Sequence, residues 1–437
     1  MDNPNRTLLN GFSKIDSTVV AQAAASFGTP FYLYDEAFII KRCRDCLKMP
    51  NPFGLTVRFA MKANTNRSLL RIINGAGLHF DASSLNEVLR AQMAGIPVED
   101  IMLTTQEVYE GEDMAKLQEL LLKGLHYNVC SLRQLHLIGT FSKERYFNPG
   151  IRIHPGVGSG ESASRNTGDE YSCFGVHLSD LKEALDFAWK NWISFKHIHV
   201  HIGSGADIEI WRQNIDLEMD LIEKYFSEAE TVGFGGGIKE ARMPDEQAAD
   251  IMSLGNHAQN RIEAFRALTR RKLKMEIEPG TFIVANSGYA VTKVLDKKHT
   301  NKSNFVIING GMEINSRPLL YGSKHPIYIV SGDGSVVKSS EFGESTSDYT
   351  AVIAGRCCES GDCQTLEADG RSMSRRMAEP EIGDFAVIGG AGAYCSSMTP
   401  FNYNSHTQVP EVLYTTNGEL RLIRKRQTLE QMLANEI

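Results

Sequence analysis

The sequence predicts an α/β fold, in which a (β/α)8 TIM barrel is followed by a C-terminal all-β domain. Short apolar runs alternate with helical stretches from about residue 54 to 278, and repeated β-α units indicate a parallel sheet. Eight such units within about 225 residues suit a closed barrel better than an open sheet. After Gly280, β-branched runs recur without long helices, which is typical of an all-β domain.

The expected barrel strands are short apolar or alternating runs. They lie at 55–60, 79–82, 101–104, 127–130, 151–153, 197–202, 232–234 and 275–277. Patterns with helical periodicity separate several of them, at 67–74, 85–93, 114–122, 217–226 and 248–269.

The expected β domain begins where the helices stop. Its strand candidates are 289–295, 305–308, 327–330, 350–354, 385–388 and 411–414, and a final helix is expected over 428–435. The strand-like run 31–34 precedes the barrel, and we expect it to pair with this domain. The predicted domains are therefore 36–278 for the barrel, and 1–35 with 279–437 for the β domain.

Composition narrows the class of protein. Of 437 residues, 42% are hydrophobic and 23% charged, as in ordinary globular enzymes, and the net charge is −7. This charge disfavours nucleic acid and anionic membranes as partners. A polar N-terminus without a signal-peptide pattern, together with the absence of any apolar run of spanning length, predicts a cytoplasmic protein. The eight cysteines indicate reduced thiols, and no metal site is expected.

Lys62 is the first candidate catalytic residue. It follows the apolar run 55–60, and side chains at the carboxyl ends of barrel strands line the ligand-binding face. A lysine among apolar neighbours can lose its proton and attack a carbonyl to form a Schiff base. Most lysines near strand ends are solvated surface residues, so the support for a catalytic role of Lys62 comes from the motifs that follow it in the sequence.

Two acidic residues end the second and the last expected barrel strands. Asp81 could contact a ligand or Lys62, whereas Ser83 or Ser84 is expected to cap the next helix. Glu278 opens the string Glu278-Pro279-Gly280. An ionised carboxylate there could keep a pyridinium nitrogen charged, which strengthens such a ring as an electron sink. The alternative is an exposed glutamate at an ordinary turn.

The expected strand 197–202 places two histidines on one side, because His199 and His201 are separated by a single residue. The string Gly203-Ser204-Gly205 lets backbone N–H groups approach an anion and adds a hydroxyl donor. Alone, either histidine is more typical of a satisfied core position.

Gly235, Gly236 and Gly237 follow the expected strand 232–234. Consecutive N–H groups in such a run form a nest suited to phosphate, and phosphate sites in barrels favour the last strands. A flexible turn is the alternative.

The expected β domain contributes further polar motifs. Cys358 and Glu359 lie in the string Cys357-Cys358-Glu359-Ser360-Gly361-Asp362. Neighbouring carboxylates raise a thiol pKa, so the cysteine could serve as a proton donor, and Glu359 could hold a substrate ammonium. Arg317 and Tyr321 could bind a carboxylate, and Tyr394 offers a phenol.

Together these strings resemble the fold-type III pyridoxal-phosphate decarboxylases, the group of the ornithine, arginine and diaminopimelate decarboxylases. The resemblance runs from Tyr32 to about Leu413 and is closest to the diaminopimelate decarboxylases. It implies an alanine-racemase-like barrel, pyridoxal 5'-phosphate as cofactor, a small amino acid as substrate, and a homodimer with shared active sites.

The resemblance also implies site roles. Lys62 would form the Schiff base, His201 would stack on the ring, Glu278 would pair with the ring nitrogen, and Cys358 would reprotonate the product from the partner subunit. The implied catalytic residues are Lys62, Cys358 and His201. The implied cofactor-binding residues are Lys62, Asp81, His201, Ser204, Gly235, Gly236, Gly237, Glu278, Gly280 and Tyr394. The implied substrate-binding residues are Arg317, Tyr321, Glu359 and Tyr394.

Departures from the family pattern gather at the substrate end of the site. Thr281 stands where members acting on diaminopimelate usually carry arginine, and Cys395, the stretch 399–401 and His406 also differ. The expected reaction is decarboxylation of meso-diaminopimelate to L-lysine and carbon dioxide. One alternative is a related substrate: D-ornithine, D-lysine, or a siderophore or antibiotic precursor. The other is a non-catalytic paralogue that binds pyridoxal phosphate or a partner protein; the presence of Lys62, Glu278 and Cys358 argues against it.

Overall fold

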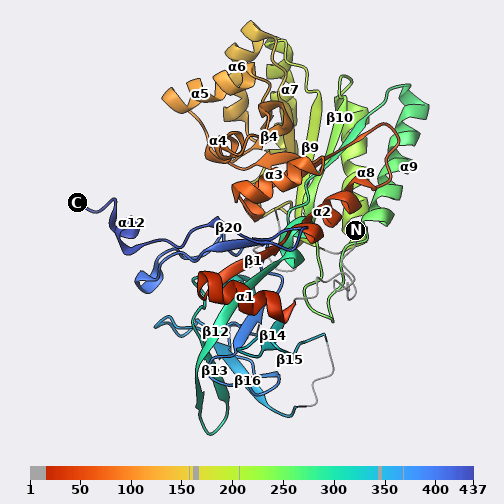
Figure 1. Ribbon diagram of the computed structural model, residues 1–437. Coiled ribbons are helices and arrows are strands. Elements are labelled where there is room, and N and C mark those ends of the chain that lie inside the picture. Colours follow the sequence, from red (N-terminus) through yellow and green to blue (C-terminus); the bar gives the residue numbers. More distant parts are fainter. Residues whose placement is uncertain (1–15, 157, 161–166, 206, 343–346, 368) are drawn as a thin grey trace. The chain divides into compact units, whose positions relative to one another are not determined.

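The computed structural model (Figure 1) describes residues 16–156, 158–160, 167–205, 207–342, 347–367 and 369–437. These residues form two compact units. The barrel unit comprises Lys41–Lys239 and Gln247–Phe282. The β unit combines the described residues up to Ile40 with Glu240–Glu246 and Ile283–Ile437.

Eight parallel strands close the barrel unit into a cylinder, which confirms the predicted fold. In spatial order each strand pairs with the next, and β9 closes the ring by pairing with both β10 and β6. The strands are β2 (Leu55–Ala60), β3 (His79–Ala82), β4 (Ile101–Thr104), β5 (His126–Val129), β6 (Gly150–His154), β9 (His197–Gly205), β10 (Thr231–Ile238) and β11 (Lys274–Ile277). Two short strands extend this sheet, β7 (Ser159–Gly160) beside β9 and β8 (Val176–His177) beside β6.

Helices follow the strands in the alternation expected of a barrel (Figure 1). They are α3 (Arg67–Gly75), α4 (Leu85–Met93), α5 (Gly111–Leu122), α6 (Leu132–Arg145), α7 (Leu181–Lys190), α8 (Ile208–Tyr225) and α9 (Ile251–Thr269), and α2 (Glu36–Leu47) precedes β2. Their starts are capped: the Ser84 side chain accepts the Glu87 N–H at α4, as expected, and Ser131 accepts the Gln134 N–H at α6. The prediction omitted α6 and α7.

The interior of the barrel contains an ion pair. Arg58 of β2 contacts Glu276 of β11 through two hydrogen bonds, Nε to Oε2 at 2.6 Å and Nη2 to Oε1 at 3.1 Å. His197 Nε2 lies 3.3 Å from the same carboxylate, and its Nδ1 lies 2.8 Å from Asn128 Oδ1. These side chains are almost fully buried, so this layer depends on mutual pairing rather than on solvent.

The β unit is a mixed sheet built around the N-terminal strand. β1 (Phe31–Asp35) pairs antiparallel with β12 (Gly288–His299) and parallel with β19 (Glu411–Tyr414), which confirms the expected pairing of this early strand. The other strands are β13 (Asn304–Ile308), β14 (Ile327–Val330), β15 (Val337–Ser339), β16 (Thr350–Ala354), β17 (Arg375–Arg376), β18 (Phe385–Ile388) and β20 (Leu420–Arg424). Its short helices are α11 (Arg317–Tyr321) and α12 (Leu429–Leu433), and α10 (Thr281–Val284) joins the last residues of the barrel unit to the first of this segment.

Helix α1 (Ser17–Phe27), which the prediction lacked, supplies part of the β-unit core. Its buried Val19, Val20 and Ala23 belong to one apolar cluster with Phe31 and Val412 of the sheet. Among the described helices, none has the length and apolarity needed to cross a membrane.

Candidate active site

Lys62 lies on a single 3₁₀ turn, Met61–Ala63, directly after β2. Met61 and Ala63 are buried on either side of it, whereas Lys62 itself is exposed. The turn packs against the loop that follows the neighbouring strand β11: the Ala60 N–H donates to Pro279 O at 3.3 Å. A Cβ added to Gly280 would lie 3.1 Å from Ala63 Cβ, so glycine lets the two strand ends approach closely.

Glu278 leaves β11 beside a histidine of β9. Its Oε1 lies 2.9 Å from His199 Nε2, and both side chains are buried. Burial opposes ionisation of Glu278, but His199, Arg152 and Lys62 outweigh it and lower the pKa of this carboxyl. Glu278 is therefore ionised at neutral pH.

Asp81 is the second buried carboxyl of the barrel mouth. Burial and the charge of Glu278 raise its pKa well above the usual range, although Lys62 and Thr104 act against them. The pKa values of these two neighbouring carboxyls are thus shifted in opposite directions, down for Glu278 and up for Asp81. The Lys62 charge acts on both, so the three predicted residues lie close together.

His201 is held by its Nδ1. Thr167 Oγ1 lies 2.7 Å from this atom, and the Gly203 N–H donates to it at 3.2 Å. Burial, then Arg152 and Lys62, lower the pKa of His201 well below its ordinary value, so the ring is neutral at neutral pH. Ser204 lies within β9, where it pairs with Gly237 of β10.

The three glycines at 235–237 differ from the sequence-based expectation. They lie inside β10, which continues to Ile238, and the ladder with β9 shifts register between Gly235 and Gly237. The expectation of a loop after residue 234 was wrong, because the neighbouring strand β9 continues the pairing through Gly205. Their role in phosphate binding stays a prediction.

Arg317 and two predicted tyrosines come together in the β unit. The guanidinium carbon of Arg317 lies 5.7 Å from the ring centroid of Tyr321 and 5.8 Å from that of Tyr394. Arg317 is buried and donates to Ser323 Oγ at 3.2 Å. Tyr394 adopts a left-handed backbone conformation, with φ of 58°, which is uncommon for a residue other than glycine.

Cys358 and Glu359 project from a loop of the β unit. Both side chains are exposed, and the Cys358 N–H donates to Asn404 Oδ1 at 2.7 Å. Glu359 accepts hydrogen bonds from Ser360 Oγ at 3.1 Å and from Tyr403 Oη at 3.2 Å, and these donors lower its pKa.

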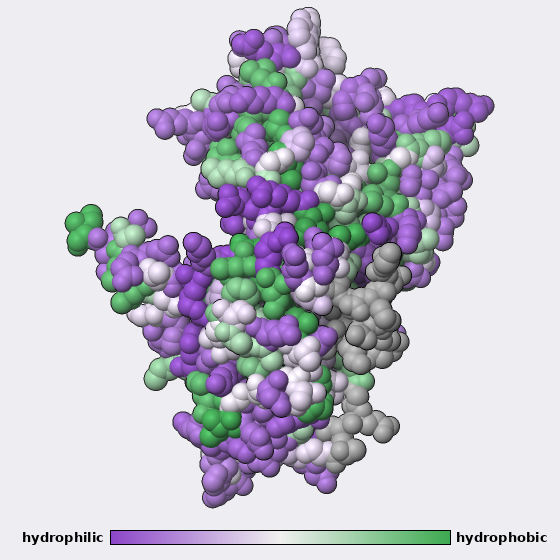
Figure 2. Space-filling view, in the orientation of Figure 1, coloured by the Kyte–Doolittle hydropathy of each residue, from purple (hydrophilic) through white to green (hydrophobic). Residues whose placement is uncertain are grey.

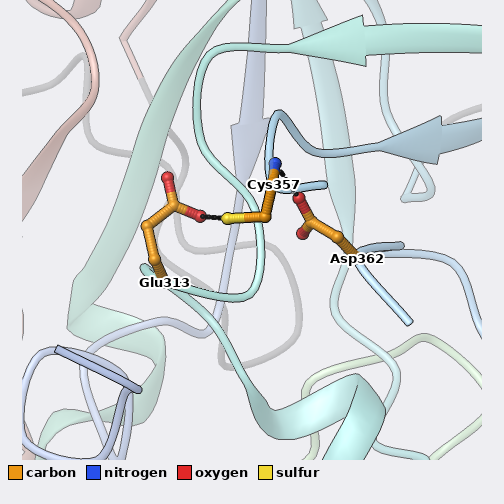
Figure 3. Close-up of side chains that lie close together, drawn as sticks. All are labelled: Glu313, Cys357 and Asp362. Atoms are coloured by element: carbon orange, nitrogen blue, oxygen red, sulfur yellow. Dashed lines mark hydrogen bonds between the residues drawn. The ribbon is translucent and has the colours of Figure 1, made fainter. Parts of the chain in front are cut away.

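Beneath this loop lies a buried cluster of Glu313, Cys357 and Asp362 (Figure 3). Cys357 Sγ contacts Glu313 Oε2 at 3.4 Å, and the Cys357 N–H donates to Asp362 Oδ2 at 2.6 Å. Burial and Glu313 raise the pKa of the Cys357 thiol. The ligand atoms lie within 4.8 Å of one another, as in a metal site.

Every carboxylate oxygen of this cluster already accepts a hydrogen bond. Arg356 Nε donates to Glu313 Oε1 at 2.9 Å, and the Gly311 N–H donates to Oε2 at 2.7 Å. The Met312 N–H donates to the remaining oxygen, Asp362 Oδ1, at 2.6 Å. The cluster therefore joins two loops, 310–313 and 355–362, and fixes the base of the segment that carries Cys358.

The prediction missed the residues that support the site. His199 was assigned only as one of two alternating histidines, and Glu313 and the role of Asp362 were absent. The sequence did contain an indication of the role of His199. Gly233 and Gly235 are two residues apart, so they face the same side of β10, and their lack of side chains leaves room in the barrel for side chains of β9 and β11.

Comparisons with known proteins agree with this geometry. Residues 36–285 match the model of the pyridoxal-dependent decarboxylase family, pyridoxal binding domain. The chain therefore belongs to the pyridoxal-dependent decarboxylases, a family of enzymes.

Similar members of the family are diaminopimelate decarboxylases. That of Escherichia coli (strain K12) is 34% identical, over 94% of this chain and 95% of the relative. A crystal structure of diaminopimelate decarboxylase superposes with a TM-score of 0.85 at 33% identity, covering 95% of this chain and 96% of that one. The Helicobacter pylori enzyme complexed with L-lysine gives a TM-score of 0.78 at 27% identity, over 95% and 98% of the two chains. The predicted family is thus confirmed.

Proposed function

We propose that this chain decarboxylates meso-diaminopimelate to L-lysine with pyridoxal 5'-phosphate bound to Lys62. The observation that carries the proposal is the meeting of Lys62 with an ionised Glu278 at the ends of the adjacent strands β2 and β11. When bound, the cofactor would supply an electron sink for the pair left as the carboxylate departs.

The barrel residues fit such a cofactor. Asp81 Oδ1 and His199 Nδ1 are buried without a hydrogen-bond partner among the described residues, as expected where a polar ligand completes the site. We propose that Lys62 holds the aldehyde, Glu278 the ring nitrogen and His201 the ring face. Ser204, the glycines at 235–237 and the backbone at Gly280 would bind the phosphate.

Residues of the β domain would act on the substrate. We propose that Arg317, Tyr321 and Tyr394 bind a substrate carboxylate, that Glu359 binds the distal ammonium, and that the Cys358 thiol donates the proton that replaces carbon dioxide. Arg317 is buried and lies near the rings of Tyr321 and Tyr394, which supports selective recognition of an anion.

Homodimerisation would complete the active site. Cys358 and Glu359 are exposed in the single chain, as are Leu429 and Leu433 of α12, at 53% and 43%. Figure 2 shows apolar side chains at this end of the chain. We propose that a second copy covers them, that 36–278 binds the cofactor, and that 1–35 with 279–437 contributes to the partner's site in a cytoplasmic enzyme.

The test is carbon dioxide release from a panel of meso-diaminopimelate and D- and L-diamino acids. We expect turnover of meso-diaminopimelate, a visible absorption band in the purified protein, and loss of that band in Lys62→Ala. Thr281, which offers no positive charge, favours D-lysine or D-ornithine as the second candidate. Faster release from these than from meso-diaminopimelate would reject the first substrate, and a protein without the band would reject the cofactor.

A further inference from the structure

The pair of His199 and Glu278 reaches across an intervening strand. His199 belongs to β9 and Glu278 follows β11, with β10 between them. The two side chains nevertheless meet at 2.9 Å inside the barrel. His199 has no exposed surface, so this contact is its principal polar interaction.

Gly235 of β10 makes this contact possible. A Cβ at residue 235 would lie 2.4 Å from His199 Nε2 and 3.0 Å from Glu278 Oε2. Gly233 lies two residues earlier on the same side of the strand, and a Cβ there would lie 3.3 Å from His199 Cδ2. Any larger residue at 235 would occupy the space of the pair itself.

The hydrogen-bonding state of His199 follows from its surroundings. Burial and the neighbouring charges of Arg152 and His197 lower its pKa, although Glu278 acts against them. A neutral ring facing a carboxylate must carry its proton on Nε2, which leaves Nδ1 as a bare acceptor. Nε2 is the ring nitrogen that faces the carboxylate, 2.9 Å from Glu278 Oε1, and Nδ1 is buried on the other side of the ring.

Charged and titratable groups face Glu278 from every side of the barrel mouth. They include His199 of β9, Arg152 of β6, Lys62 after β2, Arg58 of β2, Asp81 of β3, Cys130 after β5 and Glu218 of α8. Of these, His199 has a side-chain nitrogen 2.9 Å from the Glu278 carboxylate, and this contact lowers the pKa of Glu278.

We propose that His199 is a positioning residue that acts through Glu278. Its Nε2–H fixes Oε1 of the carboxylate and leaves Oε2 for the ring nitrogen of the cofactor, and Gly235 is required because it admits this pair. The inference rests on the proposed function, since it assumes that Glu278 meets the ring nitrogen. It also gives Gly235 a role that differs from phosphate binding.

The test compares pyridoxal phosphate with its 1-deaza analogue, which keeps the aldehyde and phosphate but lacks the ring nitrogen. Each is titrated into the full-length protein after removal of its cofactor, and the ratio of the two dissociation constants is measured. One hydrogen bond to a charged group changes an equilibrium constant by about tenfold or more. We expect His199→Leu to shrink the ratio about tenfold and His199→Gln, which retains an N–H donor, to restore part of it.

Two further variants separate positioning from a structural effect. His197→Leu removes the buried imidazole two residues earlier, which contacts Glu276 instead, and should leave the ratio unchanged. Gly235→Ala should shrink the ratio, whereas lost phosphate contacts would weaken both ligands equally.

The outcomes are distinguishable. An unchanged ratio in His199→Leu, or an equal loss in His197→Leu, would overturn the inference while leaving the proposed function intact. A wild-type protein that binds neither ligand would reject the proposed function, and the inference with it.

Discussion

Removing Arg58 should destabilise the barrel far more than removing a surface lysine with the same contact distance. Arg58 Nε lies 2.6 Å from Glu276 Oε2, and the two side chains are only 4% and 10% exposed. Lys182 Nζ also lies 2.6 Å from its partner, Asp186 Oδ2, but these side chains are 86% and 54% exposed. The two pairs share this contact distance and differ strongly in burial.

The expected loss of stability follows from the Glu276 carboxylate, which the substitution of Arg58 leaves in the barrel. Arg58→Met leaves the buried Glu276 carboxylate without its arginine partner and with the His197 ring beside it, which costs about 3–5 kcal/mol. That is a large part of the roughly 5–15 kcal/mol that stabilises a typical protein. Lys182→Met should have no measurable effect, because water solvates the released carboxylate. The double variant Arg58→Met/Glu276→Gln should recover most of the loss, because it removes the stranded charge.

The loss should also depend on pH. In the wild type, Arg58 and His197 overcome burial and lower the pKa of Glu276 well below its usual value. The stability from this carboxylate is therefore complete above its unfolded pKa of about 4.3. Without Arg58, burial raises the pKa of the folded carboxyl, so the variant loses stability as pH rises. The deficit should be larger at pH 8 than at pH 5.

Urea unfolding followed by tryptophan fluorescence measures this directly. The three tryptophans, Trp189, Trp192 and Trp211, all lie in the barrel unit, and Trp211 is buried. A loss below about 1 kcal/mol for Arg58→Met, as for a surface pair, would refute the reasoning. A deficit equal at both pH values would refute the assignment of the cost to a stranded charge.

Two further predictions concern the β unit. Asp362→Asn replaces a carboxylate that accepts two backbone N–H groups at 2.6 Å; we expect turnover to fall about tenfold with the visible band intact, and unchanged turnover would contradict the positioning of Cys358. His325 is buried and its pKa is lowered well below normal, by burial first and then by Arg242, so only the unfolded chain binds its proton below about pH 6.5. The free energy of unfolding should therefore fall as pH drops below that value. His325→Asn should remove about 1.4 kcal/mol per pH unit from the slope of this free energy against pH, measured by urea unfolding with circular dichroism. An unaltered slope would mean that a group other than His325 binds the proton.

The alternation of strands and helices was predictable because the local spacing of apolar residues indicates each element. The bounds of β2, β3 and β4, and of β16, β18 and β19, match those expected. Helix α6 was missed because its buried face includes Gln134, Gly139 and Ser142, which hydrophobic periodicity does not reveal.

The wrong prediction of a loop after residue 234, within β10, has a different physical cause. Glycine disfavours strands, so the run at 235–237 indicated a loop. The structure continues the strand there because the interior at that level is filled by His199 and Glu278 instead of by residues of β10 itself. This contact requires β9, β10 and β11 to lie side by side, and no local pattern encodes it.

The position of β1 has a consequence for synthesis. This strand is made first, yet its hydrogen-bonding neighbours are residues 288–299 and 411–414. The ribosome therefore releases the whole barrel sequence while both edges of β1 remain open to solvent. An open apolar edge can template pairing with another chain, so a nascent polypeptide of this protein is most prone to aggregate in the interval before its last strands emerge.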